Sequence, residues 1–140
     1  MVALALFMPV VAGLGGNAGS QTLALVVRGL AIGEVDSDNS RKAVLRQFAV
    51  GTVNGVAVGA IVGVVAYFWK GMPILGVVLG LAMILNILMG TLIGTLIPLS
   101  LKWFKADPAL GSHIFVTAFT DAFGFFSFLG LATLFLKILT

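Results

Sequence analysis

The sequence predicts an all-α integral membrane protein with four transmembrane helices in one chain. Charged residues make up only 9% of the 140 residues and hydrophobic residues make up 60%, whereas a soluble domain is typically about 25% charged. The mean hydropathy is +1.18. Several uncharged stretches are longer than the roughly 20 apolar residues that a helix needs to cross a bilayer. These observations exclude a water-soluble enzyme fold, and we expect no enzymatic activity.

The first two spans are expected at residues 2–27 and 44–69. The first carries no charge. It lacks the basic start of a signal peptide and is too long for one, so we interpret it as a retained helix. A polar stretch, GEVDSDNSRK, follows at residues 33–42, and its Asn39 or Ser40 is expected to cap the next helix.

The last two spans are expected at residues 74–101 and 112–138. A short connection at residues 70–73 turns the chain back after the second span, and residues 102–111 form the loop before the fourth. Because the four spans occupy nearly the whole chain, we interpret residues 1–140 as one transmembrane domain.

Basic residues are distributed unequally between the two ends of the spans. The first and third connections carry most of them: Arg28, Arg41, Lys42, Arg46, Lys102 and Lys105. The opposite side has only Lys70 and Lys137. Cytoplasmic loops carry an excess of Lys and Arg, so we expect these two connections in the cytoplasm and both chain ends outside. Such scattered basic residues suit anionic membrane lipid, and we expect no nucleic-acid partner.

Glycines recur where membrane helices are expected to pack closely. They repeat every fourth residue in the second span and form two pairs in the third: Gly51, Gly55, Gly59 and Gly63, then Gly76 with Gly80 and Gly90 with Gly94. Asn54 and Asn86 lie in the same two spans. An amide at this depth is usually an interhelical hydrogen-bonding group, although either one could instead face a water-filled path.

The middle of the first span is rich in glycine and polar residues. Pro9 removes one helical donor, and residues 13–21 (GLGGNAGSQ) form a poor continuous helix. Broken or closely approached backbone at membrane depth is tolerated only where it is buried or lines a cavity. Helical spacing places one set of residues on a common stripe: Gly13, Gly16, Asn17, Ser20 and Ala24. This stripe is either a packing face or the wall of a pore.

The fourth span contains an acidic residue at depth. Asp121 lies about nine residues, or roughly 13 Å, beyond the start of the span, near the middle of a hydrocarbon core about 30 Å thick. No other charge lies at comparable depth to pair with it. Helical spacing gives one polar stripe: His113, Thr117, Thr120, Asp121 and Gly124. The pattern favours a cation path over a protonated Asp121 that is hydrogen-bonded to a neighbouring helix.

The available ligands favour a hard cation. The chain has no cysteine, and a carboxylate with hydroxyl and carbonyl oxygens suits Mg²⁺ or Ca²⁺. Mg²⁺ gives up its water reluctantly and is commonly held through waters by one or two carboxylates. Two chains around a twofold axis would bring two Asp121 side chains to one hydrated ion.

Two segments resemble MgtE-type magnesium channels. PVVAGLGGNAGSQTLALVVRGLAIGEV, residues 9–35, resembles the second transmembrane helix of that family, and DPALGSHIFVTAFTD, residues 107–121, resembles the start of its last helix. The resemblance implies a homodimer in a bacterial or archaeal inner or plasma membrane. Mg²⁺, as the transported ion, would pass hydrated and down its electrochemical gradient through a pore on the dimer axis.

The resemblance also assigns roles to residues of this chain. It implies that Asp121 is the metal-recognising side chain and that the helix at residues 9–27 lines the same pore. Together with the two stripes, this gives the expected pore-lining residues as Gly13, Gly16, Asn17, Ser20, His113, Thr117, Thr120 and Gly124. His113-Ile114 stands where the family is expected to have asparagine followed by proline, so His113 is alternatively an interfacial or packing residue. The family has five helices per subunit. Its first helix and its cytoplasmic regulatory domains are expected to be absent from this chain, which then corresponds to helices two to five.

Two other functions remain open. A structural or assembly subunit would use Asp121 as an interhelical contact and would show no ion flux. A proton-coupled cation transporter would show flux that depends on a pH gradient. An intramembrane aspartyl protease would need a second carboxylate within the membrane, and the sequence has none.

Overall fold

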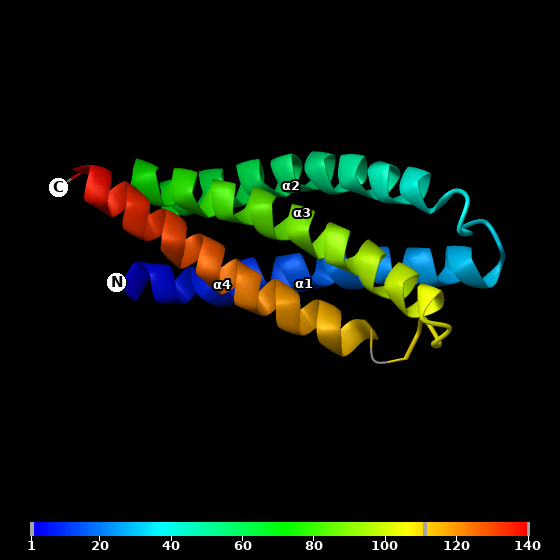
Figure 1. The fold of residues 1–140 in the computed structure, drawn as a ribbon. Helices are drawn as coiled ribbons and strands as arrows, with labels where there is room; N and C mark the ends of the chain where they lie inside the picture. The colour runs from blue at the N-terminus through cyan, green and yellow to red at the C-terminus, as the bar shows by residue number, and fades with distance from the viewer. Residues whose placement is uncertain (1, 111, 140) are drawn as a thin grey trace.

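Four long helices make up the fold. The computed structural model describes residues 2–110 and 112–139, in which the helices are α1 (Val2–Ala31), α2 (Ser40–Lys70), α3 (Pro73–Trp103) and α4 (Ser112–Leu139) (Figure 1). No strand occurs in these residues. All four helices are long and apolar enough to cross a membrane, which confirms the predicted all-α membrane fold.

The helices extend a few residues beyond the expected spans, because charged residues can continue a helix past the hydrocarbon core. α1 continues past Arg28, and α2 already includes Arg41. Asn39 is the N-cap residue of α2, but its side chain makes no cap hydrogen bond. Its Oδ1 instead accepts the backbone N–H of Asp36 at 2.9 Å. The structure thus confirms Asn39 as the cap position, although its side chain bonds within the loop's own turn and not to the helix.

The turn between α2 and α3 is made by a glycine and a proline. Gly71 ends α2 in the left-handed conformation, with φ 65°, a backbone geometry that glycine adopts without strain. Its N–H donates to the carbonyl oxygen of Tyr67 at 2.8 Å. Pro73 begins α3, where its missing N–H costs no helical hydrogen bond.

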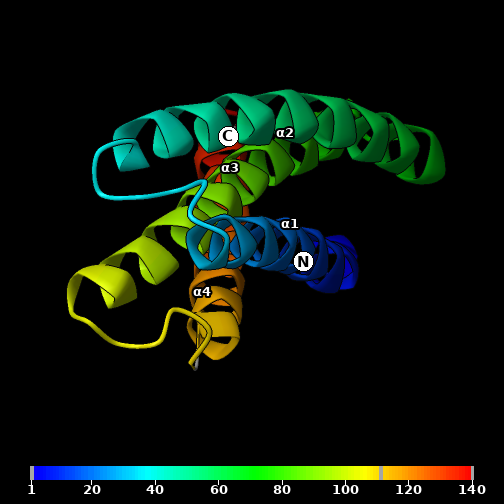
Figure 2. The ribbon, with the colours of Figure 1, turned by 90° about the vertical axis from the view of Figure 1, so that its right-hand side faces the viewer.

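α3 is the central helix. It packs against each of the other three helices, and α1 also packs against α4. Viewed along the bundle, α3 lies between α2 and α1 (Figure 2). The core gathers around Leu79 and Met83 of α3, with Phe7 and Val11 from α1 and Phe128 from α4. α2 packs mainly on α3 and leaves most of its apolar surface exposed, as suits a helix that faces lipid.

The glycines of α2 form its contact with α3, as predicted. All four are buried. A Cβ atom added to Gly59 would lie 2.7 Å from the carbonyl oxygen of Gly80, and one added to Gly63 would lie 2.8 Å from that of Gly76. Neither position has room for a side chain, so the two backbones meet directly.

The second glycine pair of α3 packs on α1. A Cβ atom on Gly90 would lie 2.5 Å from the carbonyl oxygen of Gly15, and one on Gly19 would lie 3.1 Å from that of Gly90. Gly94 meets Gly19 in the same way. The close contact of α1 therefore uses Gly15 and Gly19, which lie outside the stripe expected from the sequence.

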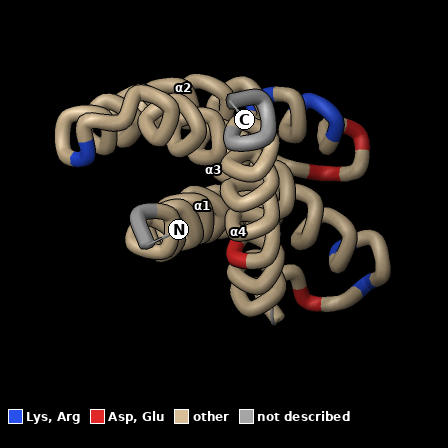
Figure 3. The backbone as a smooth tube through the Cα atoms, turned by 90° about the vertical axis from the view of Figure 1, so that its left-hand side faces the viewer, with Lys and Arg blue, Asp and Glu red and all other residues tan. Residues whose placement is uncertain are grey.

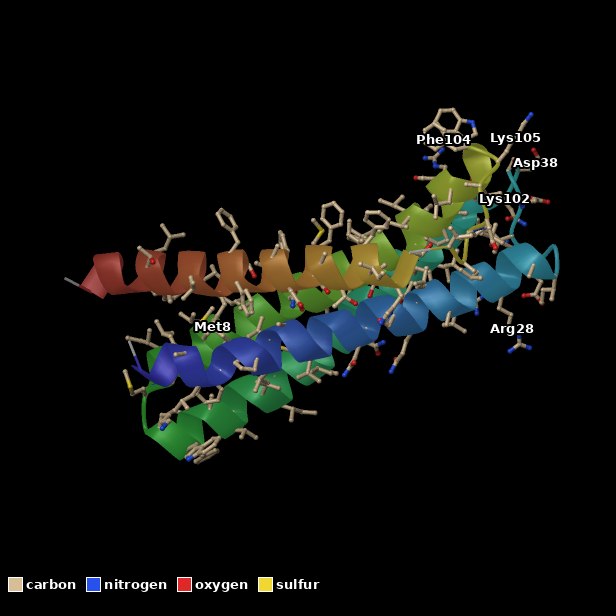
Figure 4. The ribbon with its side chains drawn as sticks, turned by 90° about the horizontal axis from the view of Figure 1, so that it is seen from below. Met8, Arg28, Asp38, Lys102, Phe104 and Lys105 are labelled. Atoms are coloured by element: carbon tan, nitrogen blue, oxygen red, sulfur yellow. The ribbon has the colours of Figure 1, made fainter. Side chains whose placement is uncertain are left out.

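Most charged residues lie in the connections or at the helix ends, and one acidic residue lies within α4 (Figure 3). Arg28, Lys102 and Lys105 lie together at the end that holds the α1–α2 and α3–α4 loops, whereas Met8 lies near the other end (Figure 4). Lys102 Nζ donates to the carbonyl oxygen of Val35 at 3.4 Å, which joins the last turn of α3 to the α1–α2 loop. This arrangement agrees with the expected pairing of loops, and their cytoplasmic location stays a prediction.

Candidate ion-conducting site on α1 and α4

The polar stripe of α4 divides into an outer and an inner part. His113 is exposed, and Thr117 and Asp121 are partly exposed. Thr120 is 1% exposed and Gly124 is buried, so both lie within the bundle. The structure therefore separates the predicted stripe: three residues reach the outer surface of α4, and two meet neighbouring helices.

Asp121 offers a free carboxylate. Its side chain makes no ion pair or hydrogen bond with any residue in the described part of the chain. It lies about 13 Å along α4 from Ser112, at 1.5 Å per residue, and therefore well inside the apolar span. A charged group is costly at this depth unless it faces water or a partner. The partly exposed carboxylate of Asp121 is thus available to water or to a partner.

The threonine hydroxyls of α4 use their hydrogens within the helix. Thr117 Oγ1 donates to the carbonyl oxygen of His113 at 2.9 Å, and Thr120 Oγ1 donates to that of Val116 at 2.9 Å. Each oxygen keeps lone pairs that can accept a hydrogen bond. Because Thr117 is partly exposed and one turn from Asp121, its oxygen can accept a hydrogen bond from water at the same surface.

The expected stripe of α1 lies beside α4. Ser20 Oγ lies 3.1 Å from His113 Nδ1, and a Cβ atom on Gly16 would lie 3.5 Å from Thr120 Oγ1. Gly13 and Asn17 are exposed on the adjoining surface, and a Cβ atom on Gly13 would meet no atom within 4 Å. The two stripes therefore join into one polar surface, to which Gly13, Asn17, Ser20, His113, Thr117 and Asp121 contribute.

α1 remains a continuous helix through its glycine-rich segment. It runs unbroken from Val2 to Ala31 with Pro9 inside it. The prediction that residues 13–21 form a poor continuous helix is therefore wrong. The glycines permit close approach instead, because Gly15 and Gly19 lie against α3. The spacing of these two glycines is a small-xxx-small pattern, and this is the sequence signal that could have identified the packing face.

The chain resembles known divalent cation transporters over nearly its whole length. The family model MgtE, described as a divalent cation transporter, matches residues 8–131. The chain belongs to the MgtE family. This finding confirms the resemblance seen in residues 9–35 and 107–121, and the matched region contains all the residues of the polar surface.

Three curated relatives are named magnesium transporter MgtE. The Bacillus subtilis protein is 35% identical over 139 residues, which cover 99% of this chain and 31% of the relative. The Thermus thermophilus protein is 34% identical over 138 residues, which cover 98% of this chain and 30% of the relative. The Enterococcus faecalis protein is 33% identical over 134 residues, which cover 96% of this chain and 30% of the relative. The chain thus spans about a third of the length of these MgtE relatives.

The acidic residues and the histidine of this MgtE protein do not lie together at one place in the part of the chain that the structure describes. No group of three or more His, Asp or Glu side chains converges in the described residues. In the α1–α2 loop, Asp36 Oδ1 accepts the backbone N–H groups of Asp38 and Asn39, so this exposed acidic stretch is organised by its own turn. Within the apolar spans, the sequence provides one carboxylate, that of Asp121.

The two amides of the middle spans lie in different surroundings. Asn86 is fully buried, and its Nδ2 donates to the carbonyl oxygen of Val11 in α1 at 2.7 Å, which confirms the interhelical role expected for it. Asn54 is exposed on α2. Among the residues described it makes no hydrogen bond to another helix, so the interhelical role of Asn54 stays a prediction.

Proposed function

We propose that this MgtE-family chain forms the ion-conducting part of a magnesium channel or transporter. The single observation that carries the proposal is the free carboxylate of Asp121, which is partly exposed on the polar surface of α1 and α4. Hydrated Mg²⁺ moves along this surface down its electrochemical gradient. The names of the three relatives support Mg²⁺ as the transported ion.

A homodimer completes the conduction path. In a lone chain, the exposed Asn17 and Gln21 and the partly exposed Asp121 would face lipid, which is costly for polar groups. A second copy related by a twofold axis covers this surface with the same surface. It also brings a second Asp121 to the path, so that two carboxylates attract one divalent ion.

Mg²⁺ keeps its inner waters in the path. It dehydrates reluctantly and is usually held with several waters still bound. Asp121 therefore accepts hydrogen bonds from these waters, and the oxygens of Thr117 and Asn17 help to orient them. The expected location is a bacterial or archaeal inner membrane, with the end that carries six basic residues in the cytoplasm.

Flux through purified chain in liposomes tests the proposal. Mg²⁺ uptake is measured with an entrapped indicator for the parent and for Asp121→Asn, which removes the charge and keeps the shape. Asp38→Asn is the matched control, because it removes the same charge from an exposed loop position. We expect flux from the parent and the control, and a loss of roughly tenfold or more in Asp121→Asn, the scale of a lost charge-assisted hydrogen bond.

The same liposomes separate the alternative functions. A structural or assembly subunit gives no flux above empty liposomes. A proton-coupled transporter gives flux that disappears when the pH gradient is collapsed with an ionophore. If Asp121→Asn conducts Mg²⁺ as well as the parent, Asp121 is structural and the proposed path is wrong.

A further inference from the structure

Asn86 lies where the two helices of the polar surface meet the central helix. It is 0% exposed in the middle of α3. A Cβ atom on Gly15 of α1 would lie 2.5 Å from its Cγ, and a Cβ atom on Gly124 of α4 would lie 2.6 Å from its Nδ2. The flat amide therefore occupies a slot between two glycines, one from each helix.

Stability alone does not account for an amide in this slot. Asn86 Nδ2 donates to the carbonyl oxygen of Val11 at 2.7 Å, but its Oδ1 is buried and has no hydrogen-bond partner in the described residues. An unpaired buried oxygen is costly, whereas an apolar group of similar size would leave nothing unpaired. The carbonyl of Val11 would keep its acceptor role within α1. The amide therefore indicates that the position of α1 on α3 must be fixed at this point by a directional hydrogen bond.

The slot lies close to the candidate ion ligand along the chain. Gly124 follows Asp121 by three residues, and these positions are neighbours on a helix surface. Gly15 precedes Gly16, whose added Cβ atom would approach Thr120 of α4. One turn farther along α3, Gly90 contacts Gly15 and the methyl group of Thr120. The face of α3 around Asn86 thus holds both helices at the level of Asp121.

We propose that Asn86 is a positioning residue for the Asp121 site. Its hydrogen bond fixes α1 along the axis of α3, and its flat amide sets the spacing between α1 and α4. It thereby determines how far the Asp121 carboxylate lies from the polar residues of α1. This inference rests on the proposed function, because the spacing matters only where a hydrated ion is selected between these helices.

Substitution by leucine tests the role without creating an unpaired group. Asn86→Leu has a similar number of atoms but a wider tip and no donor, so α1 and α4 should separate while the fold is retained. Thr91→Val is the matched control. Thr91 is also buried on α3, but its hydroxyl bonds within its own helix, to Ile87, and it lies against Gly51 of α2.

A distance measurement reports the spacing without relying on transport. The chain has no cysteine, and Val10 of α1 and Phe126 of α4 are exposed, so spin labels can be attached to cysteines at these positions. Labelled chains are diluted with unlabelled chains in liposomes, which leaves only the distance within one chain. The distribution should shift or broaden in Asn86→Leu and stay unchanged in Thr91→Val.

Ion selection provides the functional measurement. The ratio of Mg²⁺ to Ca²⁺ flux should fall roughly fivefold in Asn86→Leu, the scale expected for one lost hydrogen bond, while the chain remains folded. Thr91→Val should keep the parent ratio. An unchanged distance or an unchanged flux ratio in Asn86→Leu overturns the inference. Absence of flux in the parent overturns the proposed function and the role in ion selection, and the distance measurement still decides whether Asn86 sets the spacing.

A double substitution tests the slot itself. Gly124→Ala alone should lower the amount of folded protein, because the new methyl group collides with the amide of Asn86. In the Asn86→Ala background the amide is gone, and Gly124→Ala should then cause little further loss of folded protein. Additive losses from the two substitutions would contradict the proposed slot, since residues in contact couple and independent residues add.

Discussion

The hydroxyl of Ser20 in α1 lies 3.1 Å from Nδ1 of His113 near the start of α4. The two residues are 93 positions apart in the chain. Their contact joins the two helices that carry the polar surface, near the end of the bundle where α4 begins. His113 consequently has one ring nitrogen next to the Ser20 hydroxyl, although the residue as a whole is exposed.

Removal of this contact should weaken the α1–α4 pairing slightly. Ser20→Ala is expected to lower the free energy of unfolding in detergent by about 1 kcal/mol or less, the net value of one hydrogen bond. His113→Ala should have a similar effect, and the double variant should lose less than the sum of the two. Thr133→Val is the control, because the Thr133 hydroxyl donates within α4, to the carbonyl oxygen of Leu129. Strict additivity would mean that the contact contributes nothing.

The position of the Asp121 carboxylate should matter as well as its charge. Asp121→Glu keeps the charge but moves it by one methylene group, so we expect Mg²⁺ flux between that of the parent and that of Asp121→Asn. Thr117→Val should reduce flux only about two- to threefold, because a neutral hydroxyl contributes a weaker hydrogen bond than a carboxylate. The measurement is initial Mg²⁺ uptake in liposomes. A greater loss in Thr117→Val than in Asp121→Asn would reverse our ranking of the two ligands.

The charge distribution predicts the orientation of the chain in the membrane. Single cysteines at Lys42 and Lys105 should be protected from an impermeant thiol reagent in intact cells, and one at Lys70 should react. All three positions lie at or beyond helix ends, so labelling reports their side of the membrane. Permeabilised cells serve as the control, because every position should then react. Labelling of position 105 but not of position 70 in intact cells would show the opposite orientation.

The proposed dimer should bring the polar surfaces of two chains together. A single cysteine at Asn17, which is exposed on this surface, is expected to form a crosslink between chains in a native-like bilayer. A cysteine at Val64, which is exposed on α2 away from the polar surface, should crosslink much less. If flux persists in samples that contain only uncrosslinked monomers at every concentration, the path lies within one chain.

The direct contact of α2 with α3 predicts a large difference between two glycine substitutions. Gly63→Ala places a methyl group 2.8 Å from the carbonyl oxygen of Gly76, and overpacking of this kind typically costs about 1–3 kcal/mol. Gly130→Ala meets no atom within 4 Å, and alanine favours the helix by about 1 kcal/mol. Unfolding in detergent should therefore show opposite signs for the two variants. Equal effects would mean that α2 and α3 are not in contact at Gly63.

By itself, the sequence determined the membrane fold, the number of helices and the family. Long uncharged stretches fix these features because the bilayer requires about 20 apolar residues in each spanning helix. The sequence also distinguished Asp121, since a lone carboxylate at that depth has no structural ion partner. The glycines of α2 were interpreted correctly as packing residues, because their four-residue spacing can form only one continuous face.

The tertiary structure decided which side of each helix meets which neighbour. Periodicity grouped Gly13 with Asn17 and Thr120 with Asp121, but it cannot tell a buried stripe from an exposed one when both are made of small or polar residues. Packing against α3 buries Gly15, Thr120 and Gly124 and leaves Asn17 and Asp121 at the surface. The slot around Asn86 depends on contacts among three helices that are distant in sequence. Such a slot follows from the way the backbones approach one another, and no local pattern in the chain encodes it.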